Sequence, residues 1–331
     1  MRSLFSASIA ILMIGMCCKC DGQVASSQFV WGINGHPLTQ LAYANNIDDQ
    51  INTLNDLKLK SYRFDVLLDS NGCAKKEHLF LDLLQKLKSN GIMALPVLMQ
   101  SGIKRLSNAS MYKKSYIQGQ NFAFRYKEYI SILEVNNEAD NKMMLPGNLS
   151  GTKKKDYNVE KSERLIAAIK GFSDGVKSAN PSIKITLSVS YIHYYYLQLL
   201  KDNNVNYDII GCHWYSNMGP IGAAKPNGDD VLAIFKSRFN KPIWVTEFNH
   251  SKGTGKASFA KQSQYIVKSI PDMISRGVTG IFIYELYDQP ALKMIDYNEA
   301  FYGLVFKDNS GKYVYKDAYQ DFKQFIHNLG L

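Results

Sequence analysis

Short apolar runs alternate with longer amphipathic stretches along most of the chain. An apolar run of a few residues that is bounded by polar or turn-forming residues is typical of a buried strand. On this pattern we predict strands at residues 29–34, 61–66, 92–99, 129–135, 183–189, 207–214, 242–246 and 280–284.

Between these runs the apolar residues recur at helical spacing, as Ile47, Ile51 and Leu54 do. Pro181 stands just ahead of one predicted strand and Pro242 begins another, and each ends the helical region before it. We predict helices at residues 47–59, 78–89, 160–178, 231–238, 259–275 and 315–329.

The regular alternation of strands and helices predicts a parallel sheet covered by helices. Eight such units in a chain of 331 residues match the count and size of an α/β protein of the (β/α)8 TIM-barrel type. A doubly wound sheet would carry a glycine-rich phosphate turn after its first strand. Residues 32–37 instead read Gly-Ile-Asn-Gly-His-Pro, with proline where the helix would begin, and no P-loop motif occurs. We therefore expect one barrel domain over residues 22–331.

The N-terminus has the features of an export signal. Met1 and Arg2 precede an apolar stretch at 4–16, which is too short to span a bilayer, and small residues follow it. We predict a signal peptide at residues 1–21 and an exported protein: secreted, periplasmic or lipid-anchored at the cell surface. Cleavage near Asp21 and lipid attachment at Cys17 both remain open. No later segment is apolar enough to predict a membrane span.

Composition and charge exclude several classes of protein. The net charge is +10, but the basic residues form only short runs, at 75–76, 113–114 and 153–155, and no stripe that would indicate a nucleic-acid binder. Outside the signal only Cys73 and Cys212 remain, so no disulfide framework is implied. No Cys or His pair has zinc-ligand spacing, and we expect neither a metal nor a cofactor.

Two carboxylates stand where a barrel places its chemistry. Catalytic residues of a TIM barrel lie at the C-terminal ends of its strands. Glu138 follows the fourth predicted strand and Glu247 the seventh, and these strands face one another across the ring. Glycosidic bond cleavage uses such a pair, one group as a proton donor and the other as a nucleophile or base. The sequence therefore favours hydrolysis of a glycoside.

Several short motifs resemble those of glycoside hydrolase clan A, a group of TIM-barrel enzymes that retain the β configuration. Residues 131–139 read Ser-Ile-Leu-Glu-Val-Asn-Asn-Glu-Ala and residues 244–248 read Trp-Val-Thr-Glu-Phe, similar to the clan's strand-four and strand-seven motifs. Further similar segments follow in the right order, at 62–65, 212–215, 284–288, 302–305 and 315–319.

The C-terminal motifs are most similar to those of family 39 and of neighbouring family 5 members. The chain departs from the pattern at Asn136, where a Trp often precedes the Asn-Glu pair, and at Ala139, where a Pro often follows it. These departures leave both carboxylates intact and the exact family and sugar open.

The resemblance assigns roles to five residues. It implies that Glu138 is the general acid/base and Glu247 the nucleophile, with the two carboxyl groups ~5–5.5 Å apart. It also implies that Glu138 has the higher pKa, raised by apolar surroundings and by the charge of Glu247. Asn137 would bind the sugar 2-hydroxyl, and Arg63 and Tyr215 would keep Glu247 ionised and oriented.

Further polar and aromatic residues at strand ends are candidates for substrate contact. His213 is expected either to orient Glu138 or to bind substrate. The other candidates are Trp214, His36, Tyr284 and Glu285. The expected substrate is an oligosaccharide or polysaccharide. We expect the protein to be a monomer and to bind no nucleic acid. The rival interpretation is a secreted carbohydrate-binding barrel with weak or no catalysis.

Overall fold

The structure is a computed structural model that describes residues 29–102, 106–147 and 149–329. The predicted signal peptide at residues 1–21, with Cys17, lies outside the described residues. Among the helices that the structure does describe, none is long and apolar enough to cross a bilayer.

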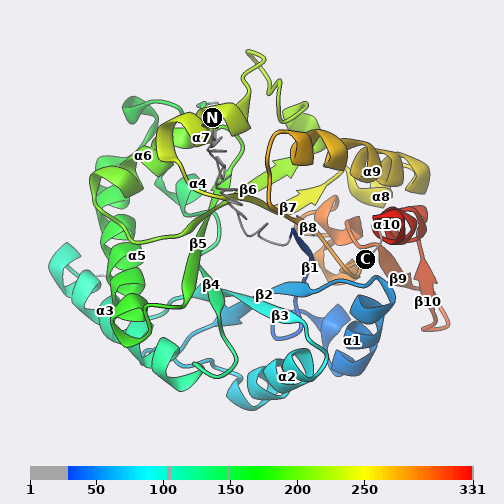
Figure 1. Cartoon of the computed structure of the whole chain (residues 1–331), viewed down its shortest axis with the longest axis horizontal. Coiled ribbons are helices and arrows are strands. Elements are labelled where there is room, and N and C mark those ends of the chain that lie inside the picture. The colour runs from blue at the N-terminus through cyan, green and yellow to red at the C-terminus, as the bar shows by residue number, and fades with distance from the viewer. Residues whose placement is uncertain (1–28, 103–105, 148, 330–331) are drawn as a thin grey trace, which may run out of the picture.

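Eight parallel strands form a closed barrel in sequence order, ringed by helices, as Figure 1 shows. The ring closes where Val30 of the first strand pairs with Gly280 of the last. The strands are β1 (Val30–Gly35), β2 (Ser61–Leu67), β3 (Met93–Met99), β4 (Ile132–Val135), β5 (Lys184–Ser190), β6 (Ile209–Tyr215), β7 (Ile243–Asn249) and β8 (Gly280–Ile283). The predicted TIM barrel is confirmed. β4 is shorter than predicted, and β7 extends three residues further.

The helices cover the outside of the barrel. They are α1 (Ile47–Asp56), α2 (Glu77–Ser89), α3 (Asn108–Arg125), α4 (Ala139–Met143), α5 (Val159–Ala179), α6 (Tyr194–Asp202), α7 (Val231–Phe239), α8 (Gly253–Lys256), α9 (Phe259–Ser275) and α10 (Asp317–Asn328). Before α10 the chain forms an antiparallel hairpin of β9 (Val305–Lys307) and β10 (Tyr313–Tyr315). The sequence did not predict α3, α6 or this hairpin.

Helix α3 packs unusually closely against α5, through glycines rather than large apolar side chains. A Cβ atom on Gly119 would lie 2.1 Å from the carbonyl oxygen of Phe172, and one on Gly175 would lie 2.0 Å from that of Tyr116. The buried face of α3 also includes Ser115 and Gln118. Because this face lacks a stripe of large apolar residues, hydrophobic periodicity gives little signal for the helix.

The inside of the barrel changes character along its axis. Near the N-terminal ends of the strands the interior is an apolar layer, which we call the floor, made of Leu95, Ile132, Ile209, Trp244 and Phe282. The ring of Phe282 packs directly against the backbone of Gly32 in β1. A Cβ atom on Gly32 would lie 2.3 Å from this ring, so only glycine fits there. Towards the C-terminal ends the buried interior residues become polar and charged, among them Arg63, Glu134 and Glu247.

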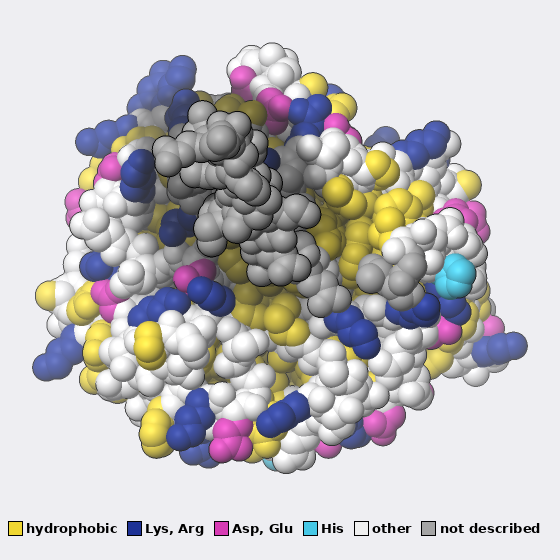
Figure 2. All heavy atoms as spheres, in the orientation of Figure 1, with side chains coloured by type: hydrophobic (Ala, Val, Ile, Leu, Met, Phe, Trp, Pro, Cys, Tyr) yellow, Lys and Arg dark blue, Asp and Glu magenta, His cyan; other side chains and the backbone are white. Residues whose placement is uncertain are grey.

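Basic side chains are spread around the visible rim of the molecule in Figure 2 rather than gathered in one stripe. This distribution agrees with the absence of a long basic run in the sequence. A nucleic-acid binder concentrates its positive charge along one face or groove.

Candidate active site

Glu247 reaches the barrel interior because β7 carries an irregularity. Cys212 pairs with Val245, but the next residue of β6, His213, pairs with Glu247, so Thr246 is an extra residue in β7. Such bulges re-aim side chains and are frequent beside active sites. Glu247 is 6% exposed, and its Oε1 and Oε2 accept hydrogen bonds from Arg63 Nη1 and Tyr215 OH, both at 2.8 Å.

Glu138 lies just past the end of β4 in a left-handed backbone conformation, with φ 46°. Few non-glycine residues adopt this conformation, and those that do are enriched at functional sites. Its backbone N–H donates to Ser188 Oγ at 3.0 Å, and Asn141 Nδ2 donates to its Oε2 at 3.0 Å. Ser188 thus holds the backbone of Glu138, and Asn141 holds its carboxylate.

His213 of β6 lies between the two carboxylates. Its Nδ1 is 2.9 Å from Glu138 Oε1 and 3.4 Å from Glu247 Oε2. One ligand-type atom from each of the three side chains falls within 4.8 Å of the others. The structure therefore brings the two predicted catalytic residues together around a fully buried histidine, whose position fits the predicted orienting role.

Arg63 of β2 connects most of the charged groups at the C-terminal end of the barrel interior. Its Nε and Nη2 bind the two carboxylate oxygens of Glu134 at 3.0 and 2.7 Å, and its Nη2 also donates to Asn137 Oδ1 at 2.8 Å. Asn34 Oδ1 accepts from its Nη1 at 2.7 Å. A planar guanidinium suits such two-pronged contacts, and it cannot lose its charge in the protein.

Sequence reasoning missed Glu134 as a member of this site. It is fully buried on β4, two residues after Ile132 of the floor, so both side chains face the barrel interior. A lone carboxylate inside an otherwise apolar strand could have indicated a buried partner, because an unpaired buried charge is costly. Its role is to hold Arg63.

The pKa of Glu138 differs from the expectation of a raised value. Burial raises it, but the hydrogen bond and charge of His213 lower the pKa of Glu138 to about 2, with help from Ser190 and Asn141. Burial lowers the pKa of His213, yet the charge of Glu247 and the Glu138 hydrogen bond raise it overall. This lowered pKa contradicts the prediction that Glu138 carries a raised one, and the reason is that a hydrogen-bond donor, His213, faces the carboxylate.

A second polar cluster joins β1, β2 and the segment after β8. His36 Nδ1 contacts Asp65 Oδ2 at 2.5 Å, and its Nε2 is 3.4 Å from Glu285 Oε2. Tyr43 OH donates to the same Glu285 oxygen at 2.6 Å, and Gln289 Nε2 donates to both oxygens. Burial would lower the pKa of His36, but Asp65 and Glu285 raise it to about 9.

Two predicted substrate contacts need correction. Trp214 is fully buried and donates its indole N–H to the Gly219 carbonyl, so it belongs to the core. Glu285 is also fully buried, its oxygens are taken by Tyr43 and Gln289, and burial raises its pKa to about 8. Both residues are buried next to the site and contact other protein groups.

Tyr284 and His36 lie nearer the site than Trp214 but are also largely buried. Tyr284 is 6% exposed, and its hydroxyl donates to Glu299 Oε1 at 2.6 Å. Its ring lies edge-on to His36 and to Tyr215, with centroids 5.7 and 6.4 Å away. The ring therefore presents little face for sugar stacking and mainly fixes its neighbours.

Glu138, His213 and Glu247 are also of the types that bind metal ions. Each carboxylate oxygen of the two glutamates already accepts a hydrogen bond or ion pair, from His213, Asn141, Arg63 or Tyr215. Arg63 Nη2 also lies 3.3 Å from His213 Nε2 and brings a fixed positive charge to the cluster. Because hydrogen-bond donors already occupy these oxygens, the arrangement suits proton transfer better than the binding of a metal cation.

Residues 135–284 match the family described as glycosyl hydrolase catalytic core. No characterised protein matches the chain in sequence at a significant level. The matched segment contains Glu138, His213 and Glu247, so the family assignment and the geometry refer to the same part of the barrel.

Several solved structures are similar in fold. A family 1 β-glucosidase from Thermotoga maritima has a TM-score of 0.65 and 13% identity, covering 92% of this chain and 98% of its own. A family 39 glycoside hydrolase from Bacteroides cellulosilyticus WH2 has a TM-score of 0.68 and 16% identity, covering 91% and 64%. The virulence factor SghA from Agrobacterium tumefaciens has a TM-score of 0.65 and 11% identity, covering 90% and 96%.

At these identities the structures show the fold, and the family match carries the assignment of activity. The family match and the fold agree with the predicted resemblance: residues 135–284 match a glycosyl hydrolase catalytic core, and the chain folds as a (β/α)8 barrel.

Proposed function

We propose that the protein is an exported retaining β-glycoside hydrolase that cleaves O-glycosidic bonds in an oligosaccharide or polysaccharide. Glu138 is the general acid/base and Glu247 the nucleophile. One observation carries this proposal: an oxygen of each carboxylate lies within 4.8 Å of the other, with His213 between them. Retaining enzymes hold their carboxyl groups about 5–5.5 Å apart, whereas inverting enzymes need about 6.5–9.5 Å to admit a water.

Glu247 is arranged for attack on an anomeric carbon. Its two oxygens are bound by Arg63 and Tyr215, which stabilise the ionised form and fix its orientation. Tyr215 in turn stacks on Tyr302, with ring centroids 5.6 Å apart, so the hydroxyl is held in place. A preorganised, ionised carboxylate of this kind forms a glycosyl-enzyme ester in the first step.

Glu138 must hold a proton when the leaving oxygen departs, although His213 lowers its pKa. His213 Nδ1, at 2.9 Å, is the neighbouring group that can share a proton with it. A bound sugar excludes water from Glu138 and so disfavours its charged form, which moves the shared proton towards the carboxylate. When Glu247 is esterified, Glu138 then acts as the base that activates water.

Asn137 is placed to contact the sugar. Its Oδ1 accepts from Arg63, and among the described residues its Nδ2 has no hydrogen-bond partner. A free donor beside both carboxylates fits a contact to the 2-hydroxyl, where hydrogen bonds strengthen in the transition state.

A 2-fluoro glycoside with an activated leaving group tests the mechanism, because it slows the breakdown of the ester more than its formation. We expect a covalent adduct on the peptide that contains Glu247, detected by mass spectrometry. With Glu138→Ala, azide should rescue turnover of a substrate with a good leaving group and give the β-azide. An inverted product, or label on another residue while hydrolysis proceeds, contradicts the proposal.

The second candidate is a carbohydrate-binding barrel that does not turn over. It predicts affinity for a glycan with no covalent label on Glu247. Export rests on the sequence alone, and fractionation of the producing cells tests it: the protein should leave the cytoplasm, and Cys17→Ala should release it from membranes if it is lipid-anchored.

A further inference from the structure

A cavity of about 940 Å3 opens beside the catalytic centre on the side of β2, β3 and β4. Its walls include Met99 at the end of β3, Met111 on α3 and Arg164 on α5. Asn136, which precedes the Asn137-Glu138 pair, also lines it. Lys142 of α4 lies at the boundary, and its Nζ donates to the Asn137 carbonyl at 3.0 Å. Through Asn136 and Lys142 the cavity therefore lies next to the segment that carries Asn137 and Glu138.

The charge of this cavity is one-sided. Four cationic residues line it, Lys75, Lys142, Lys161 and Arg164, and no acidic residue is among its described lining residues. In the described part of the chain, Lys75, Lys161 and Arg164 form no ion pair with a carboxylate. These charges come from separate segments, the loop after β2 and helices α4 and α5, so the fold collects them at one place.

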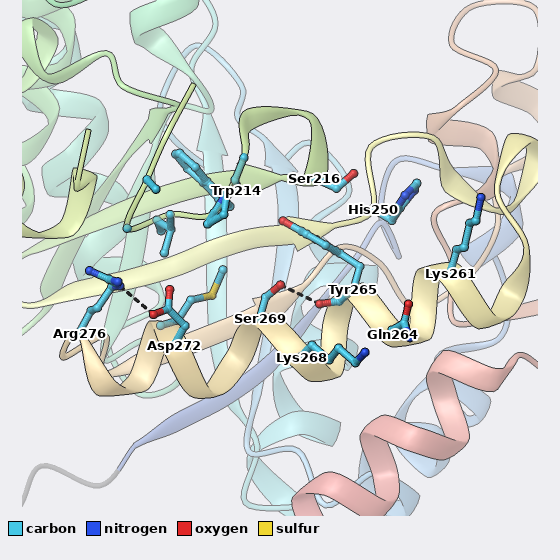
Figure 3. Close-up of a pocket in the computed structure, with 16 residues that line it drawn as sticks. Trp214, Ser216, His250, Lys261, Gln264, Tyr265, Lys268, Ser269, Asp272 and Arg276 are labelled. Atoms are coloured by element: carbon cyan, nitrogen blue, oxygen red, sulfur yellow. Dashed lines mark hydrogen bonds and ion pairs between the residues drawn. The ribbon is translucent and has the colours of Figure 1, made fainter. Parts of the chain in front are cut away.

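A second cavity of the protein shows that its basic composition does not by itself give every cavity a lining without acidic residues. This cavity, of about 690 Å3, lies along α9 and is lined by Lys261, Lys268 and Arg276 among others; Figure 3 shows these residues. There Asp272 also lines the wall and binds Arg276 Nε at 2.9 Å.

The remaining surface of the first cavity suits a sugar. Leu67, Leu165 and the two methionines provide apolar contacts for the C–H faces of a pyranose ring. The amides of Gln100 and Asn136 lie 3.4 Å apart and offer hydrogen-bonding groups for hydroxyls. Binding pockets typically combine such apolar walls with a few polar groups that fix orientation.

We propose that this cavity is a subsite for an anionic sugar unit, carrying a carboxylate or a sulfate ester, next to the bond that is cleaved. The inference rests on the proposed function and narrows it: the natural glycan is acidic. Lys75, Lys161 and Arg164 hold the anionic group, and the guanidinium of Arg164 can bind two of its oxygens at once. Lys142 faces Glu138 and marks the inner end of the subsite.

Paired glycans test the charge requirement with the full-length exported protein. One pair is glucuronoxylan and its carboxyl-reduced form, and the other is a sulfated galactan and its desulfated form. Affinity electrophoresis should show about tenfold tighter binding of the charged member of at least one pair at low salt. The pair that responds identifies the anionic group as a uronate or a sulfate.

Two variants locate the effect. Lys161→Gln/Arg164→Gln should lose the charge preference, about tenfold, while keeping kcat/KM on a small neutral aryl glycoside. Lys268→Gln, in the cavity along α9, removes a matched charge and should leave the preference intact. Equal binding of both members of both pairs overturns the inference, as does an equal loss in the Lys268→Gln control. If no glycoside is hydrolysed but the charge preference and its dependence on Arg164 remain, the proposed catalysis fails and the subsite stands.

Discussion

The same strands build two different regions of the barrel interior: the apolar floor, near their N-terminal ends, and a polar, charged region near their C-terminal ends. In the floor, Ile132 and Trp244 pack with Phe282 in a layer without charges. Two residues further along β4, Glu134 faces the same interior and pairs with Arg63. Burying apolar surface stabilises a fold, whereas burying an ion pair contributes little net stability even when its geometry is good. The barrel thus gains stability at one end and carries its chemistry at the other.

The difference between the two ends also depends on a break in strand alternation. On β7, regular alternation from Trp244 would direct Thr246 and then Phe248 inward. The extra residue at Thr246 instead brings Glu247 opposite His213, while the ring of Phe248 packs against Tyr265 of α9, with centroids 5.1 Å apart. Regular geometry therefore serves the floor, and a local irregularity serves the site.

The largest effect should come from Glu247→Gln. The change keeps the shape of the side chain and removes the proposed nucleophile, so we expect kcat to fall about ten-thousand-fold with the thermal unfolding temperature unchanged or higher. Glu138→Gln should also abolish most hydrolysis of natural glycans, with a smaller loss on substrates whose leaving group needs no proton. Near wild-type kcat in either variant on the best natural substrate would show that the role of that residue is wrongly assigned.

Arg63→Met should damage both activity and stability. It leaves Glu134 and Glu247 buried without their guanidinium partner, which we expect to cost about 3–5 kcal/mol in the free energy of unfolding. Urea denaturation measures this cost. The double variant Arg63→Met/Glu134→Gln should regain part of the stability but none of the activity. If the double variant is no more stable than Arg63→Met, the buried charge on Glu134 is not the cause.

Phe282→Ala tests the other side of the comparison. Phe282 is fully buried in the floor, and its loss should lower the free energy of unfolding by about 3 kcal/mol. Because the floor does not touch the reacting groups, kcat and KM of the folded protein should stay close to wild type at low temperature. A large fall in kcat without unfolding would contradict the separation of the two regions.

The same comparison explains what the sequence could and could not predict. Elements with apolar stripes were predicted well, and α9 has the predicted bounds, 259–275. Helix α3 was missed because Ser115, Gln118 and Gly119 interrupt the apolar residues of its buried face, so the hydrophobic period is weak. Close backbone packing replaces large side chains there, and that becomes visible only in three dimensions.

Within the site, the two facing carboxylates and the partners of Glu247 were predicted, and Glu134 was not. Glu138 and Glu247 are recognisable because each lies in a local motif. The pairing of Arg63 with Glu134 joins residues 71 positions apart, which no local pattern reports. Trp214 was wrongly expected to contact substrate, although alternation on β6 already indicates that it points outward when His213 points inward.

The smallest effect concerns pH and the cluster behind the site. The pKa of His36 is raised to about 9 in the folded protein, against an ordinary value of 6.5 in the unfolded chain. The folded state therefore binds more protons between these values, and this contribution to stability is complete below pH 6.5 and lost as the pH rises towards 9. We expect the wild type to lose about 2 kcal/mol between pH 6.5 and 8.5 from this group. Glu285, with a pKa raised to about 8, acts in the same direction from pH 4.5 upward.

His36→Gln should flatten that dependence while leaving the floor untouched. Chemical denaturation at a series of pH values measures it, with Phe282→Ala as the matched control, because that variant should lower stability by the same amount at every pH. The reason is that the His36 effect is a proton linkage through Asp65 and Glu285, whereas the Phe282 effect is a loss of packing. If His36→Gln and Phe282→Ala give parallel curves, His36 does not titrate in this range, and the upper cluster would differ from the floor in polarity alone.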